Sequence, residues 1–115
     1  MANRSYTIGR LKPGQMNKTE AAYAAELEQR KYAGEILWYA FEPWKFRLAD
    51  KTFYTPDFGV LRADHQVECH EVKGFWQDDA RVKIKVAAEQ HPFRFIAVKK
   101  RPKKDGGGFA REVFE

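Results

Sequence analysis

The sequence predicts one α/β domain in which two helices flank a mixed sheet. Two stretches, 17–33 and 79–91, contain strong helix formers and no internal glycine or proline. Between and after them lie runs rich in aromatic and β-branched residues, separated by turn-forming residues. The order is therefore helix, three or four strands, helix, strand. This order is typical of helices packed on one sheet whose first strands run in antiparallel succession.

The first helix is expected to begin after Asn17, behind a basic arm. Residues 1–16 contain arginine, lysine, glycine and proline, which predicts an irregular and flexible arm. Asn17 is a good N-cap residue, and Glu20 stands three positions later, as in a capping box. Gly34 is expected to stop the helix, because glycine readily adopts the left-handed conformation that follows many helix ends.

Four strands are expected between the helices, at 35–42, 44–49, 51–62 and 65–74. Pro56 cannot donate to a ladder, so it predicts a bulge or an edge just before Asp57. After the second helix we expect a core strand at 93–100, a basic glycine-containing loop at 101–108 and a short edge strand to the end of the chain. The chain therefore divides into an arm at 1–16, a domain at 17–100 and a basic C-terminal segment at 101–115.

Length and composition limit the possible classes of protein. With 115 residues, of which 43% are hydrophobic and 32% charged, the chain is long enough for one core. It has no apolar run long enough to cross a membrane and no signal-peptide pattern, so we expect a cytoplasmic protein without a membrane partner. The single Cys69 excludes an intramolecular disulfide and a cysteine-based zinc cluster. A formal net charge of +5 indicates a polyanionic partner, with nucleic acid as the first candidate.

Alternation along the strands brings acidic and basic side chains toward one point. Glu71 and Lys73 share one face of the fourth strand, and Asp57 lies on the preceding strand. Glu20 falls on the apolar stripe of the first helix with Tyr23, so its carboxylate is expected to face the sheet, where it needs a partner. Two or three carboxylates suit Mg²⁺ or Mn²⁺, which can polarise a phosphoryl oxygen and lower the pKa of a bound water. The pattern therefore predicts metal-dependent hydrolysis of a phosphodiester.

Each residue of this group has an expected role. Asp57 and Glu71 are expected to bind the metal ion, with the carbonyl of Val72 as a further oxygen ligand and Glu20 as an auxiliary one. Lys73 is expected to orient the attacking water and to stabilise charge on the phosphate. Simpler interpretations stay open: Glu71 and Lys73 as a solvated ion pair, Asp57 as a turn residue, and Glu20 as a helix cap only.

These motifs resemble those of the PD-(D/E)XK nuclease superfamily. The chain carries "TPDF" at 55–58 and "HEVKG" at 70–74, with "NKTE" at 17–20. Over 15–98 it more closely resembles a small family of phage and prophage proteins of uncharacterised function that are described as endonucleases. The resemblance implies a restriction-endonuclease-like αβββαβ core, Mg²⁺- or Mn²⁺-dependent cleavage of DNA, and a phage or prophage origin. It does not imply a particular substrate.

Several residues are candidates for contacts with DNA, namely Arg81, Lys83, Lys85, Lys18 and Trp76. Arg81 and Lys85 lie one turn apart on the second helix, directly after the Glu-x-Lys strand, although solvated helix residues have the same spacing. The basic cluster at 99–104 is either a mobile phosphate clamp or a solvated segment. His70 points away from Glu71 and is expected to be a packing or surface residue, and Cys69 is expected to be a small buried one.

Two forms of the nuclease hypothesis and one alternative remain. A structure-selective nuclease would act on branched or single-stranded DNA, and a homodimer would make two cuts related by a two-fold axis. The alternative is a non-catalytic nucleic-acid-binding module that retains the nuclease fold. A complete carboxylate and lysine set favours the enzyme.

Overall fold

A computed structural model describes residues 14–73 and 78–114 of the chain. In chain order the elements are α1 (Lys18–Tyr32), β1 (Ile36–Phe41), β2 (Phe46–Ala49), β3 (Thr52–Tyr54), β4 (Phe58–Arg62), β5 (Val67–Lys73), α2 (Asp78–Gln90), β6 (Arg94–Lys100), the 3-10 helix η1 (Lys103–Asp105) and β7 (Phe109–Phe114). Most of the expected basic arm lies outside the described residues. No helix in the described part of the chain is long and apolar enough to cross a membrane.

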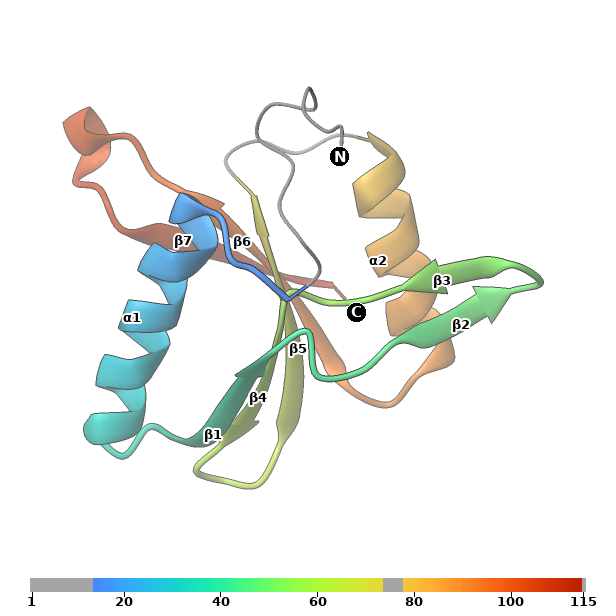
Figure 1. The fold of residues 1–115 in the computed structure, drawn as a ribbon, viewed down its shortest axis with the longest axis horizontal. Helices are drawn as coiled ribbons and strands as arrows, with labels where there is room; N and C mark the ends of the chain where they lie inside the picture. The colour runs from blue at the N-terminus through green and yellow to red at the C-terminus, as the bar shows by residue number, and fades with distance from the viewer. Residues whose placement is uncertain (1–13, 74–77, 115) are drawn as a thin grey trace, which may run out of the picture.

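The larger sheet is mixed, as the sequence predicts. Its strand order is β1-β4-β5-β6-β7. The first three of these run in antiparallel succession, and α2 connects β5 to the parallel strand β6. At the far edge β7 pairs antiparallel with β6, which confirms the expected edge strand. Figure 1 shows α1 and α2 on opposite sides of this sheet, so the domain has three layers.

The expected strand at 51–62 is wrong in one respect, because the structure divides it into β3 and β4. The strands β2 and β3 form a separate two-stranded sheet, and this hairpin lies against α2 (Figure 1). Pro56 lies at the division, where its missing N–H prevents continued pairing. The chain leaves the larger sheet after β1, forms the hairpin, and returns at β4. The two ends of this excursion meet where the Glu42 N–H donates to the Asp57 carbonyl over 2.7 Å.

The helix α1 begins and ends where the sequence predicts. Asn17 is the N-cap and forms a reciprocal capping box with Glu20, which confirms the expected helix start. The chain leaves the helix through Gly34 at a φ of 85°, in the left-handed region that favours glycine. Tyr23 and Leu27 on the inner face of α1 are fully buried. They anchor the helix to the sheet.

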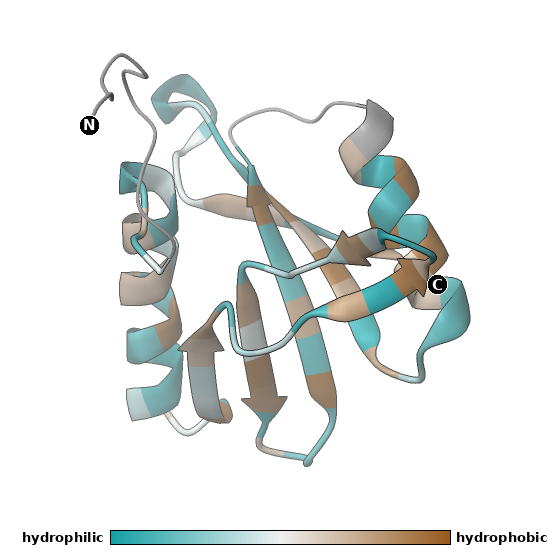
Figure 2. Ribbon diagram, turned by 45° about the vertical axis from the view of Figure 1, so that its right-hand side comes forward, coloured by the Kyte–Doolittle hydropathy of each residue, from teal (hydrophilic) through white to brown (hydrophobic). Residues whose placement is uncertain are grey.

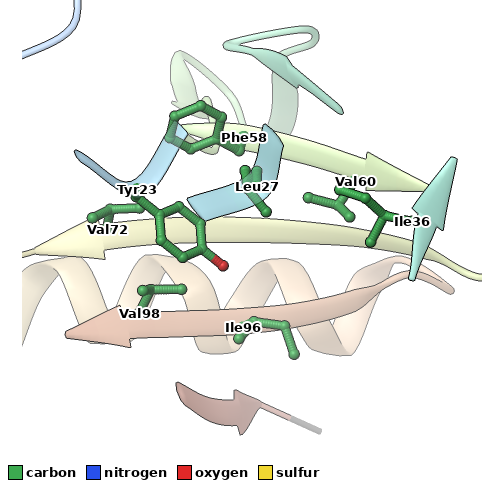
Figure 3. Close-up of a cluster of buried hydrophobic side chains, with 8 residues drawn as sticks. All are labelled: Tyr23, Leu27, Ile36, Phe58, Val60, Val72, Ile96 and Val98. Atoms are coloured by element: carbon green, nitrogen blue, oxygen red, sulfur yellow. The ribbon is translucent and has the colours of Figure 1, made fainter. Parts of the chain in front are cut away.

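One apolar cluster fills the space between α1 and the sheet. Figure 3 shows its members, which come from α1, β1, β4, β5 and β6: Tyr23, Leu27, Ile36, Phe58, Val60, Val72, Ile96 and Val98. A second cluster lies on the opposite face, under α2 and the hairpin, and comprises Tyr54, Cys69, Ile84, Ala87 and Phe95. In Figure 2 hydrophilic residues interrupt the hydrophobic ones along β5, whereas β4 is mainly hydrophobic. Cys69 is buried, as expected, and burial raises the pKa of its thiol to about 11.

His70 is a fully buried member of a polar network under α1. The Tyr23 hydroxyl lies 2.7 Å from His70 Nδ1, and Glu68 Oε1 lies 2.8 Å from His70 Nε2. Burial lowers the pKa of His70, so the neutral ring donates from Nε2 to Glu68 and accepts the Tyr23 hydroxyl at Nδ1. Arg62 completes the network by donating to Glu68 Oε2 over 3.3 Å. The network joins α1 to β5 through groups that each have a partner.

Gly59 of β4 allows the start of the hairpin to pack closely on the sheet. A Cβ added there would lie 2.7 Å from Pro43 Cγ and 2.7 Å from Trp44 Cη2, both parts of rigid rings. We expect Gly59→Ala to lower the free energy of unfolding by about 1–3 kcal/mol, as is usual for an overpacked core. Chemical denaturation measures this change. The same substitution should cost less in a Trp44→Ala background, and an equal cost in both backgrounds would show that the Trp44 ring is not the source.

Candidate functional site

Asp57 is held in place by its main chain and its side chain together. It is the last residue before β4, and only 7% of its surface is exposed. Its Oδ2 accepts the Val72 backbone N–H over 2.8 Å, while its carbonyl accepts the Glu42 N–H. A carboxylate bonded in this way has little freedom to turn toward solvent. Asp57 lies outside the strands, as the turn interpretation requires. It nevertheless belongs to the site, because its carboxylate is bonded to β5.

Glu71 lies on the α2 face of β5 between two polar groups. It is 7% exposed, and the Tyr54 hydroxyl donates to its Oε1 over 3.0 Å. Lys73 Nζ lies 3.3 Å from its Oε2, so this ion pair is partly buried rather than a solvated surface pair. The expected alternation of side chains along β5 is confirmed, since Cys69 packs on the α2 face and Val72 on the α1 face. The structure thus brings Asp57, Glu71 and Lys73 together.

Both carboxyl groups are difficult to ionise, for partly different reasons. Burial, followed by the charge of Glu71, raises the pKa of Asp57 from its ordinary 3.8 to about 8. Burial also raises the pKa of Glu71, although the ammonium of Lys73 and the hydroxyl of Tyr54 favour its charged form. Burial alone would lower the pKa of Lys73, but the carboxylates of Glu71 and Asp57 outweigh it and raise that pKa. Lys73 is therefore a stable cation beside two carboxyl groups that resist charge.

Glu20 is engaged in the helix cap and also influences the site. Its Oε1 accepts the Asn17 N–H over 2.9 Å, so the cap interpretation is confirmed. Its side chain is only half-buried, in contrast to the fully buried Tyr23 one turn later on the same stripe. Its charge nonetheless adds to the raised pKa of Asp57 and to that of Lys73. The role of Glu20 as an auxiliary ligand remains a prediction.

The donor set fits a hard divalent cation with two protein carboxylates. Within residues 14–73 and 78–114, no three His, Cys, Asp or Glu side chains are grouped to hold a metal ion. Mg²⁺ commonly takes one or two carboxylates and keeps several waters, so the pair Asp57 and Glu71 is sufficient. A cation between them would also offset the burial of both carboxyl groups and the repulsion that Glu71 exerts on Asp57. At Val72 the observed bond is made by the N–H, and its carbonyl as a ligand remains a prediction.

The candidates for DNA contacts lie on several elements. Lys18 is the first residue of α1, and Lys83 and Lys85 lie on α2; all three are exposed. Arg81 makes a two-bond ion pair with Glu112 of β7, its Nη2 lying 3.0 Å from Oε2, so part of its role is to join α2 to β7. Trp76 lies outside the described residues. Contact of these residues with DNA remains a prediction.

Sequence reasoning missed Tyr54, which the fold places against Glu71. Its hydroxyl is delivered by the hairpin, and no periodic pattern relates β3 to β5 across that excursion. Burial and the adjacent Glu71 carboxylate raise the pKa of this hydroxyl, which therefore stays a donor at neutral pH. The only local signal is that Tyr54 stands three residues before Asp57. That spacing alone does not indicate a contact.

Searches against protein-family models, curated proteins and solved structures returned no match. The fold and the geometry of the site show an α/β protein with a buried acidic pair, Asp57 and Glu71, beside Lys73.

The raised pKa values predict an unusual dependence of stability on pH. Because the folded state binds the Asp57 proton more tightly than the unfolded state, the contribution is fully present below pH 3.8 and is lost as pH rises toward about 8. Asp57→Asn removes the ionisation and keeps an acceptor for the Val72 N–H. Without divalent cations, this variant should be more stable than the wild type near pH 8 and show a smaller difference near pH 4. Thermal unfolding across this range measures the effect, and parallel curves for the two proteins would contradict it.

The Tyr54 hydroxyl should contribute measurably to stability. Tyr54→Phe leaves a buried carboxyl oxygen of Glu71 without its donor, at an expected cost of about 1–3 kcal/mol in the free energy of unfolding. Tyr39→Phe is a matched control, because the Tyr39 hydroxyl donates to Glu28 Oε1 over 2.7 Å in an exposed setting. The control should cost less, because water can replace an exposed donor. Equal costs would show that burial of the Tyr54 bond is not important.

Proposed function

We propose that this protein is a metal-dependent endodeoxyribonuclease that hydrolyses phosphodiester bonds in DNA. The observation that carries the proposal is the convergence of Asp57 and Glu71, two buried carboxyl groups with raised pKa values, beside the Lys73 ammonium. Perturbed pKa values caused by burial and like charge are concentrated at functional sites. Mg²⁺ or Mn²⁺ is the expected cofactor, because two oxygen ligands suit a hard cation.

The order of elements supports the same proposal. When the hairpin β2–β3 is regarded as an insertion between β1 and β4, and η1 and β7 as additions after the core, the remaining order is α1, β1, β4, β5, α2, β6. This is the αβββαβ order that the resemblance to the PD-(D/E)XK superfamily implies. We propose a restriction-endonuclease-like core on this basis. Asp57 then stands at the start of the second core strand, and Glu71 and Lys73 stand on the third.

Each protein group has a chemical task in the proposed reaction. A divalent cation, when bound, supplies positive charge that polarises a phosphoryl oxygen. Asp57 and Glu71 would hold this cation, since the Val72 N–H and the Tyr54 hydroxyl limit the rotation of their carboxyl groups. Lys73 keeps its proton because its pKa is raised, so it acts as a donor and not as a base. Its ammonium can orient the attacking water and stabilise charge that develops on the phosphate.

A specific observation favours the non-catalytic alternative, a nucleic-acid-binding module that retains this fold. Glu71 is paired with Lys73 and Tyr54, and Glu20 is engaged in its cap, so the carboxylates have partners within the protein. Titration calorimetry with Mn²⁺ separates the two functions. Heat of binding in the wild type that is lost in Asp57→Ala supports the enzyme, and no heat in either protein supports the binding module.

Substitutions at the site should abolish cutting but preserve binding to DNA. Asp57→Ala removes a metal ligand, and Lys73→Ala removes the charge beside the phosphate, so each should lower the cleavage rate by at least about a hundredfold. Cleavage of plasmid and branched DNA in Mg²⁺ or Mn²⁺, followed on gels, measures this loss. A binding assay in Ca²⁺ should show affinities close to that of the wild type.

A matched control distinguishes loss of the site from loss of charge. Lys31→Ala removes a lysine from the last turn of α1 and should leave cleavage unchanged. Cleavage at wild-type rates in both Asp57→Ala and Lys73→Ala would overturn the assignment.

A further inference from the structure

A cavity lies beside the carboxylate pair, between the start of α2 and the strands β6 and β7. Its volume is about 260 Å³, and it is lined by Arg81, Ala97, Lys99, Ala110, Arg111 and Glu112. Two of these residues are alanines on neighbouring strands, which leave the space that larger side chains would fill. Neither the acidic pair nor the helix α1 contributes to the lining.

The register of the sheet places this cavity next to the site. In the parallel pair, Glu71 is opposite Ala97 and Lys73 is opposite Lys99. Register partners project from the same face of a sheet, and adjacent strands lie about 4.8 Å apart. Lys99 therefore stands on the same face as Lys73, one strand farther from Asp57. Both lysines lie near the carboxyl ends of their strands.

The charge of the cavity suits a phosphate diester. Lys99 is exposed, and no residue in the described part of the chain forms an ion pair with its ammonium. The guanidinium of Arg81 is held at the rim by its ion pair with Glu112. The guanidinium of Arg111 is directed instead toward Glu26 and the Tyr23 hydroxyl on α1. Among the cations that line the cavity, Lys99 is therefore the one proposed to bind a ligand.

We propose that this cavity is the subsite for a second backbone phosphate of the bound strand, next to the phosphate at Asp57 and Glu71, with Lys99 as its contact. The proposal rests on the proposed function and adds the path of the substrate, which crosses β5, β6 and β7 in that order. It also separates Lys99 from the rest of the basic cluster at 99–104. Lys100 is opposite Phe109, which packs against the apolar cluster under α1, so Lys100 projects from the other face.

The neighbouring lysines form a matched pair for the test. Both variants, Lys99→Gln and Lys100→Gln, are made in an Asp57→Asn background, and fluorescence anisotropy with labelled DNA is measured in Mg²⁺ over a range of salt concentrations. Lys99→Gln should weaken binding severalfold and reduce the slope of log affinity against log salt by about one, the value for one lost phosphate contact. Lys100→Gln should leave the slope unchanged.

A second variant tests the space and not the charge. Ala110→Leu, at an exposed position of the edge strand, fills the cavity without removing a cation and should also weaken binding. Equal slopes for Lys99→Gln and Lys100→Gln in a chain that binds DNA would overturn the subsite alone. Failure of the wild type to bind DNA would overturn both the subsite and the nuclease function. Binding without cutting would overturn the nuclease function, and the slopes would then decide the subsite.

Discussion

The bond from the Val72 N–H to the Asp57 carboxylate is the constraint on which the candidate site depends. It joins the end of the hairpin excursion to the central strand β5, and it places a residue before β4 beside Glu71. It also favours the charged form of a carboxyl group that burial and Glu71 disfavour. Without this donor, an acid in such a position would be buried beside a second acid with little to offset the cost.

The strand β5 separates two tasks by the alternation of its side chains. On the α1 face, the neutral ring of His70 donates to the Glu68 carboxylate and accepts the Tyr23 hydroxyl. On the α2 face, Glu71 accepts the Tyr54 hydroxyl of the hairpin and pairs with Lys73. The first set holds α1 against the sheet, and in the second set the Lys73 ammonium offsets part of the cost of burying Glu71. A site of this kind is maintained by rigid neighbouring elements, because its groups would otherwise rotate into water.

The sequence by itself determined those features whose causes are local. The capping box of Asn17 and Glu20 sets the start of α1 through bonds between residues three apart, and Gly34 ends the helix. Period-two alternation correctly placed Cys69 and Val72 on opposite faces of β5, and with them Glu71 and His70. The order of helices and strands followed from the same short-range signals, except that the expected strand at 51–62 is divided into β3 and β4. The acidic pair was predicted because both of its residues lie on or next to paired strands.

Only the tertiary structure decided the contacts that cross the excursion. Pro56 indicated that the strand pairing is interrupted before Asp57. The position of the β2–β3 hairpin depends instead on its packing against α2 and on the space left by Gly59. That packing brings the Tyr54 hydroxyl to Glu71, and the α1 packing brings Tyr23 to His70, residues 47 positions apart in the chain. No periodic pattern in the sequence predicts such contacts, because they depend on how separate elements pack together. For the same reason, the cavity beside Lys99 is visible only in the folded sheet.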